Sequence, residues 1–306
     1  MLYISTRNNV DTYTAFRALC NERSPDGGYF VPFYLPSFSL DALKHFKSKP
    51  AYDTIAEILN LFFSLRLTAA DIEQTIGNPA LSCESLNQNL LVAELWHTPE
   101  GNSDYIFKKL NYLMTGNLQL PVGWTRIAIE ISLLFCVYGI ISAKEKALDV
   151  AVAADDLASI TAISFAKAMG LPIGLTICSC EDNSFLWDFI NKGECCVSSA
   201  PAYTELFLYK LLGGDALAAY LAAADKKRSF CLDDASRQIL ACEFYPAVVS
   251  GNRADSIITG MYRSNHYALD IGAALAYGGL QDYRAIVGVN KNTLIFANNR
   301  PERIKE

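Results

Sequence analysis

Cysteine side chains that could bind metal or act as nucleophiles occur in two short patterns. Cys178 and Cys180 are separated by one residue, and Cys195 and Cys196 are adjacent. Neither pair has a second pair at the spacing of a zinc finger, and the chain has only three histidines, so we predict no metal site. Nothing in the sequence selects one thiol as a nucleophile, and buried, inert thiols are the commoner case.

Two adjacent carboxylates, Asp155 and Asp156, stand ahead of a predicted helix. Such a pair could bind Mg²⁺, which prefers carboxylates and water. It could equally cap the helix, because an Asp side chain accepts hydrogen bonds from first-turn N–H groups, and we favour this interpretation. The sequence contains no glycine-rich loop of the nucleotide-binding types.

The second half of the chain alternates predicted strands and helices. Residues 148–154 predict a buried strand, 157–169 a helix and 175–178 a second strand, which together form one βαβ unit of a parallel sheet. Two further strands are expected, at residues 285–289 and 292–297.

The first ninety residues are predicted to be mostly helical after a short strand at residues 2–5. Asp11 is expected to cap a helix that ends near residue 20. Residues 52–66 form the next helix, because their apolar side chains recur at helical spacing. A third helix covers residues 69–76 and is ended by the Gly77 turn.

Composition limits the class of protein. The 306 residues are 51% hydrophobic and 19% charged, with a formal net charge of -6, so we expect a folded core and neither a nucleic-acid nor a membrane partner. The start of the chain lacks the pattern of a signal peptide. The longest apolar stretch, 127–141, contains Glu130 and favours a buried helix over a membrane span. Nine cysteines, an odd number, favour thiols in a reducing cytoplasm.

Five segments resemble, in the same order, segments of threonine synthases. They are 3–8 (YISTRN), 25–32 (PDGGYFVP), 94–97 (ELWH), 166–173 (AKAMGLPI) and 211–215 (LLGGD). The resemblance implies the α/β architecture of fold-type II pyridoxal-phosphate enzymes. We therefore expect a mostly helical N-terminal domain over residues 1–92, followed by a reduced parallel-sheet domain over residues 93–306.

Threonine synthases convert phosphohomoserine to threonine, and a lysine forms the Schiff base with the cofactor. The family places Phe-Lys-Asp seven residues after a histidine that resembles His97. Here Phe-Lys comes later, at Lys108, and the next residue is Lys109. The resemblance makes these two lysines candidate catalytic residues, but we favour solvated helix residues, since lysine is normally exposed.

Three other residues are candidates for cofactor binding by the same resemblance. Asn298 stands where the family has the threonine near the pyridine nitrogen. Ser159 ends the segment 153–159, which corresponds to the phosphate-binding loop but lacks its glycines. His266 persists in the segment 264–268, where it either belongs to the site or orders a loop.

A whole module of the family has no counterpart here. After its lysine, the family has a segment that binds the substrate's carboxylate, and roughly 100 residues, about one small domain, are missing at this point. The chain instead continues to 124–127 (WTRI), which resembles a helix beyond the module. The loss argues against threonine synthesis.

Three functions follow, in order of preference. The first is a non-catalytic pseudoenzyme without a cofactor that binds a small metabolite or a partner protein. The second is a pyridoxal-phosphate-dependent lyase that uses Lys108 or Lys109. The third is a subunit that pairs with a complete enzyme chain, and a homodimer is a related expectation because lost packing would leave apolar surface exposed.

Overall fold

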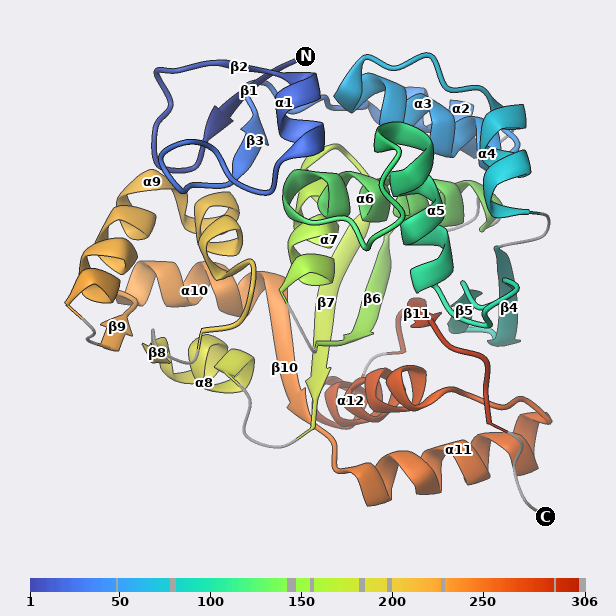
Figure 1. Ribbon diagram of the computed structural model, residues 1–306. Helices are drawn as coiled ribbons and strands as arrows, with labels where there is room; N and C mark the ends of the chain where they lie inside the picture. The colour runs from blue at the N-terminus through green and yellow to red at the C-terminus, as the bar shows by residue number, and fades with distance from the viewer. Residues whose placement is uncertain are drawn as a thin grey trace.

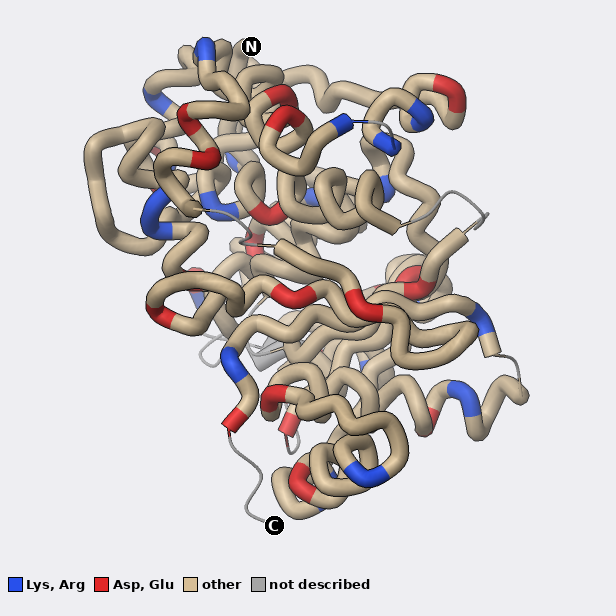
Figure 2. Tube along the Cα trace, turned by 90° about the vertical axis from the view of Figure 1, so that its right-hand side faces the viewer, with Lys and Arg blue, Asp and Glu red and all other residues tan. Residues whose placement is uncertain are grey.

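The computed structural model contains a six-stranded sheet with helices on both faces and a three-stranded sheet near the N-terminus (Figure 1). The structure describes residues 1–47, 49–77, 81–141, 147–154, 157–181, 185–196, 200–226, 229–288 and 290–302. In this part of the chain, charges of both signs are interspersed along the trace (Figure 2). The predicted α/β fold class is confirmed.

The N-terminal sheet is antiparallel. Its strands, in spatial order, are β2 (Tyr13–Thr14), β1 (Leu2–Ser5) and β3 (Phe30–Pro32). Helix α1 (Ala15–Cys20) follows directly, and the Thr14 side chain accepts a hydrogen bond from the Arg17 amide. The prediction that Asp11 caps this helix is wrong, because pairing with β1 keeps the chain extended through Thr14.

Three helices complete the N-terminal part. They are α2 (Leu40–Lys47), α3 (Ala51–Phe63) and α4 (Ala69–Ile76). Ile55, Ile58 and Phe62 are fully buried on one side of α3, as their helical spacing predicts, and α3 packs against the central helix α6 (Gly123–Ile140). Thr68 caps α4 through a reciprocal capping box.

The large sheet is parallel except at one edge. Its strands, in spatial order, are β10 (Phe244–Val248), β7 (Ile173–Cys180), β6 (Leu148–Ala153), β11 (Thr293–Ala297), β5 (Leu90–Glu94) and the antiparallel edge strand β4 (Ser82–Asn87). The predicted βαβ unit is confirmed as β6, α7 (Ala158–Ala168) and β7. The expected domain boundary after residue 92 falls inside β5 and stays a prediction.

Helices cover both faces of this sheet (Figure 1). Val150 and Val152 of β6 belong to the core under α6 and α7, whereas Ala151 belongs to the core under α12 (Ile271–Val287). This alternation follows from the two-residue period of a strand. Helix α11 (Gly251–Asn265) packs on the outer side of α12.

The remaining elements lie on two sides of the sheet. They are α5 (Asp104–Thr115), which precedes α6, and then α8 (Phe185–Lys192), β8 (Glu194–Cys196), α9 (Thr204–Asp225), β9 (Ser229–Cys231) and α10 (Asp234–Glu243). Helix α5 packs against α4 and α6, and the others lie on the side of β10 and α7. By length and composition, α6 and α9 could each cross a membrane. The apolar window of α6 is 78% buried, which identifies a core helix as predicted, and α9 is interrupted by non-helical backbone at Gly213.

One predicted strand is wrong. Of the strand expected at residues 285–289, the described residues 285–288 do not form a strand, because α12 continues to Val287 and ends with Gly288 in the left-handed conformation. A short apolar run fits a helix or a strand equally well, and here it completes a helix whose last turn is exposed, with Ile286 at 73%.

Candidate functional site

A cavity of about 80 Å³ lies at the carboxyl ends of β6 and β11, where ligands bind in open α/β sheets. The starts of α5, α7 and α12 also reach it. Its polar side chains come from Ser103, Arg126, Glu130, Ser159 and Asn298, and apolar side chains from α5, α6 and the strands complete the lining.

An ion pair on α6 borders the cavity. Arg126 donates from Nε to Glu130 Oε1 at 2.8 Å, and its Nη2 lies 2.6 Å from the same oxygen. The Arg126 guanidinium carbon also lies 3.8 Å from the centre of the Phe107 ring. The Glu130 side chain is 9% exposed, so the pair places a buried negative charge beside the space that a ligand would occupy.

Ser159 joins this pair to the start of α7. Its hydroxyl donates to Glu130 Oε1 at 3.2 Å. A helix start attracts negative charge, because its first N–H groups are not used within the helix. The Glu130 carboxylate therefore lies where the fold would otherwise favour an external anion.

The C-terminal segment closes the other side of the cavity. The Asn298 carbonyl accepts a hydrogen bond from the Ser103 amide at 2.8 Å. Asp270 caps α12 at Ala273 and also accepts from the Asn299 amide, both at 2.6 Å. Burial raises the pKa of Asp270 more than its backbone hydrogen bonds lower it.

The five residues singled out from the sequence do not all meet here. Ser159 and Asn298 line the cavity. Lys108 and Lys109 lie on α5 without lining it: Lys108 Nζ is 3.6 Å from a Glu100 carboxylate oxygen, and Lys109 faces a tyrosine ring. His266 is exposed at the end of α11. Their catalytic or binding roles stay predictions.

Two predictions cannot be followed in the structure. The adjacent Asp155 and Asp156 lie outside the described residues, as do the side chains of Cys195 and Cys196. Within the described part of the chain, no cluster of three or more metal-binding side chains occurs.

Sequence reasoning missed the Arg126–Glu130 pair. The available indication was a basic and an acidic residue four positions apart inside an otherwise apolar helix. Glu130 attracted notice only as an obstacle to a membrane span, whereas the structure makes it the central charge of the cavity.

A second polar cluster surrounds Glu94 at the end of β5. Its carboxylate accepts from Ser82 at 2.7 Å and from the Tyr267 hydroxyl at 2.5 Å, and it lies 2.7 Å from His97 Nε2. Burial alone would raise the pKa of Glu94, but these hydrogen bonds outweigh burial and lower it. Trp96 stacks on the His97 ring at 3.9 Å.

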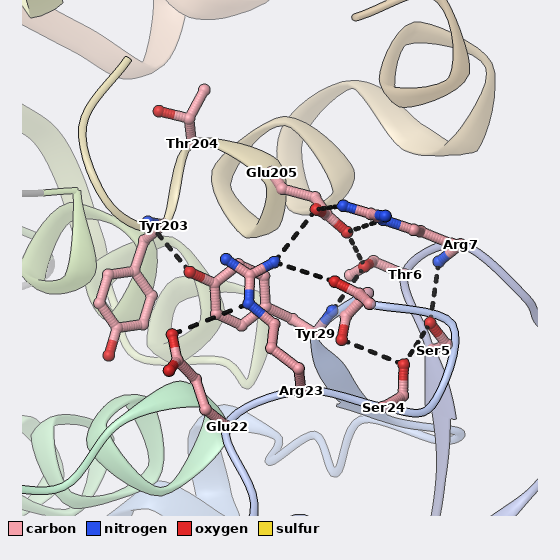
Figure 3. Close-up of polar contacts among 12 residues, drawn as sticks. Ser5, Thr6, Arg7, Glu22, Arg23, Ser24, Tyr29, Tyr203, Thr204 and Glu205 are labelled. Carbon is pink, nitrogen blue, oxygen red and sulfur yellow. Dashed lines mark hydrogen bonds and ion pairs between the residues drawn. The ribbon is translucent and has the colours of Figure 1, made fainter. Parts of the chain in front are cut away.

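The N-terminal motif forms a third cluster (Figure 3). Thr6 donates to Glu205 on α9 at 2.5 Å, and Arg7 donates to both oxygens of the same carboxylate, at 3.1 and 2.8 Å. The Ser24 hydroxyl contacts Asp26, which also accepts from Ser5 at 2.7 Å. The motif thus ties the small sheet to the start of α9.

Comparisons with known proteins place this geometry in a structural class. Residues 2–79 match the family model described as the threonine synthase N terminus. The pyridoxal-phosphate-bound threonine synthase of Brucella melitensis superposes with a TM-score of 0.84 at 16% identity, over 98% of this chain and 89% of that one. The yeast enzyme gives 0.80 at 15%, over 97% and 87%. The Escherichia coli enzyme gives 0.72 at 14%, over 98% and 89%.

The chain therefore has the fold-type II architecture of pyridoxal-phosphate enzymes. More particularly, it has the fold of threonine synthases, and residues 2–79 match the family model of their N-terminal part. No curated protein matched the sequence.

The described cavity does not fit pyridoxal phosphate. Ligand pockets usually measure roughly 300–1,000 Å³, well above the volume found here. No lysine is among the described residues that line the cavity, so none supplies an amine for a Schiff base. A phosphate at the start of α7 would also meet the Glu130 carboxylate, which has the same sign of charge.

Proposed function

We propose that this protein is a non-catalytic relative of threonine synthase, which acts by binding a small metabolite or a partner protein. The observation that carries the proposal is the Arg126–Glu130 pair, which fills the inherited cofactor cavity with an internal anion. Ser159, a residue of the former phosphate-binding segment, donates its hydrogen bond to Glu130.

A physical argument supports the loss of the cofactor. To admit a phosphate, the cavity would have to separate a buried ion pair or place two anions side by side. Leaving a buried charge without its partner costs several kcal/mol, about 3–5 in typical cases. The cofactor would have to recover this free energy without a lysine to hold it covalently.

The test is a titration of the purified full chain with pyridoxal phosphate. The mixture is examined for the visible aldimine band, reduced with borohydride and mapped by peptide mass spectrometry. We expect no band at saturating cofactor. We also expect no lysine to be labelled more strongly than Lys44, which is exposed and therefore measures non-specific reaction. A band together with a label on Lys108 or Lys109 would overturn the proposal and favour the alternative of a pyridoxal-phosphate-dependent lyase.

A self-associating subunit is a second candidate, favoured by the segment between α5 and α6. This segment and the last turn of α5 expose several apolar side chains, namely Tyr112, Leu118, Leu120 and Val122, at 40–53%. We expect sedimentation analysis to find a dimer that Leu118→Asp dissociates, whereas Phe16→Asp, at another exposed apolar position, does not. A monomeric parent protein would contradict this candidate.

A further inference from the structure

A second, larger cavity lies between the N-terminal sheet and α9, apart from the inherited one. It has a volume of about 340 Å³, within the usual range for small-molecule sites, and it shares no lining residue with the cavity beside Glu130. Arg7, Arg23, Tyr29, Tyr203 and Glu205 line it (Figure 3).

This cavity offers a ligand hydrogen-bond donors, because its buried acceptor is already occupied. Glu205 is 7% exposed and already accepts four hydrogen bonds: one from Thr6, two from Arg7 and one from Arg23 at 3.2 Å. A carboxylate offers about four acceptor positions, so this one is saturated. In contrast, the polar contacts of Arg23 with described residues are made by Nε, to Glu22, and by Nη1, to Glu205 and the Gly27 carbonyl.

Charge balance leaves the cavity attractive to one anion. Two guanidinium cations, Arg7 and Arg23, face the single buried carboxylate of Glu205. Three further carboxylates are nearby, and all are exposed: Glu22, 3.7 Å from Arg23 Nε, and Asp26 and Asp225, which both interact with Arg7. Water and salt screen exposed charges, so these three offset the second guanidinium less than buried carboxylates would.

Contacts within the protein fix the orientation of the two guanidinium groups. The Arg23 guanidinium carbon lies 3.6 Å from the centre of the Tyr29 ring, and Arg23 Nη1 also donates to the Gly27 carbonyl at 3.2 Å. Each arginine side chain is 35–39% exposed, so each can still meet a ligand from solvent. A fixed planar donor of this kind suits the two oxygens of a carboxylate.

Tyrosine and apolar side chains form the rest of the cavity wall. The ring of Tyr203 stacks on Tyr29 with centroids 5.5 Å apart, and the Tyr203 amide donates to the Tyr29 hydroxyl. Tyr203 has a positive φ of 70°, a strained conformation for a bulky residue, and such strain often occurs at binding sites. Pro201, Tyr220 and Leu221 extend this wall.

We propose that this cavity binds a small organic monocarboxylate with an apolar or aromatic body. The carboxylate contacts the guanidinium groups of Arg23 and Arg7, and the body lies against the tyrosine wall. The site is independent of the inherited cavity, so its occupation does not require the loss of cofactor chemistry.

The test uses the full chain and 4-fluorobenzoate, observed by fluorine NMR at constant ionic strength. We expect saturable binding at millimolar or lower probe concentrations. The uncharged analogue 4-fluorobenzamide has nearly the same shape and is expected to bind at least tenfold more weakly, because it lacks the charge-assisted hydrogen bonds.

Arg23→Gln is the decisive variant. It removes the cation and is expected to weaken 4-fluorobenzoate binding about tenfold or more. Arg237→Gln, at another partly exposed arginine, should leave binding unchanged. Circular dichroism checks that each variant is folded. If Arg23→Gln does not fold, Arg23→Lys keeps the charge but loses the planar donor pair, and intermediate weakening is expected.

Three results would overturn the proposal. They are no saturable binding to the parent protein, equal binding of the acid and the amide, and an affinity that neither Arg23 variant changes. Each would reduce the Arg7–Arg23–Glu205 cluster to a structural tie between the small sheet and α9.

Discussion

Glu130 carries a buried charge at the cavity beside α6. It contributes a buried charge to α6, and its partners Arg126 and Ser159 come from the turn before it and from the neighbouring helix. A neutral side chain at this position would leave the Arg126 cation, 19% exposed, without the carboxylate it needs.

We predict that Glu130→Ala lowers the free energy of unfolding by about 3 kcal/mol in urea denaturation. The double variant Arg126→Met/Glu130→Leu should be more stable than the single one, because it buries no unmatched charge. Asp41→Ala, which breaks the fully exposed pair with Lys44, should not change the curve measurably. A Glu130→Ala curve that matches the parent curve would contradict the assigned role.

Glu94 is expected to make the free energy of unfolding depend on pH in the acid range. Its pKa in the folded protein is lowered below the ordinary value, so the ionised group stabilises the fold above its unfolded-state pKa. That contribution is lost as the pH falls through the lowered, folded-state pKa. We predict a shallower loss of stability in acid for Glu94→Gln than for the parent protein, measured as urea midpoints against pH. Glu100→Gln, at an exposed position, is the control, and equal slopes for all three proteins would contradict the prediction.

At the scale of elements, Gly28 shows why the N-terminal motif needs its second glycine. A Cβ atom there would lie 2.2 Å from the Ser5 hydroxyl oxygen and 2.9 Å from the Thr6 hydroxyl oxygen. Those hydroxyls hold Asp26 and Glu205, so they cannot move aside without breaking the cluster that joins β1 to α9.

Gly28→Ala is therefore predicted to destabilise the protein by about 2 kcal/mol in thermal or urea unfolding, as overpacking usually does. Gly214→Ala is the matched control, because a Cβ atom at this position on α9 would have no neighbour within 4 Å. This control should be neutral or more stable by up to about 1 kcal/mol, since alanine favours a helix. Equal effects of the two substitutions would contradict the steric argument.

Local elements were the most predictable part of the structure. Helices α3 and α4, the β6–α7–β7 unit and the buried nature of α6 all follow from apolar spacing, caps and breakers. Strand and helix are not distinguished by a short apolar run, which explains the error at residues 285–289.

The candidate sites were predictable only in part, because their partners are distant in sequence. Ser159 and Asn298 were singled out by resemblance, and both line one cavity, but their binding roles stay predictions. Thr6 and Glu205 are 199 residues apart in the sequence, and no local sequence pattern predicts a contact over that separation. The contact between Glu130 and Ser159 became visible only once α6 was packed against α7.

At the scale of the whole molecule, one core joins the N-terminal part to the larger sheet. Buried side chains run continuously from Tyr3 through α3 and α6 to Phe244. A second cluster of buried side chains, which includes Ile177 and Ile295, lies on the other face of the same sheet. The small sheet and the large one therefore share the helix α6 as common support.

We predict a single cooperative unfolding transition, because no part of this core can open without exposing the rest. Far-ultraviolet circular dichroism and tryptophan fluorescence should give the same urea midpoint. The fluorescence of Trp124 reports on the shared core. In a Trp124→Phe variant, the remaining tryptophan fluorescence comes from outside that core. Midpoints that differ between the two probes would show that the parts unfold separately.

The contact between Thr6 and Glu205 also has a consequence for synthesis on the ribosome. Translation proceeds at about 5–20 residues per second, so Glu205 is made roughly 10–40 s after Thr6. During that interval Arg7 and Arg23 have no buried counter-charge, and the small sheet lacks the helix it is tied to. A segment made early is thus among the last to acquire its native surroundings.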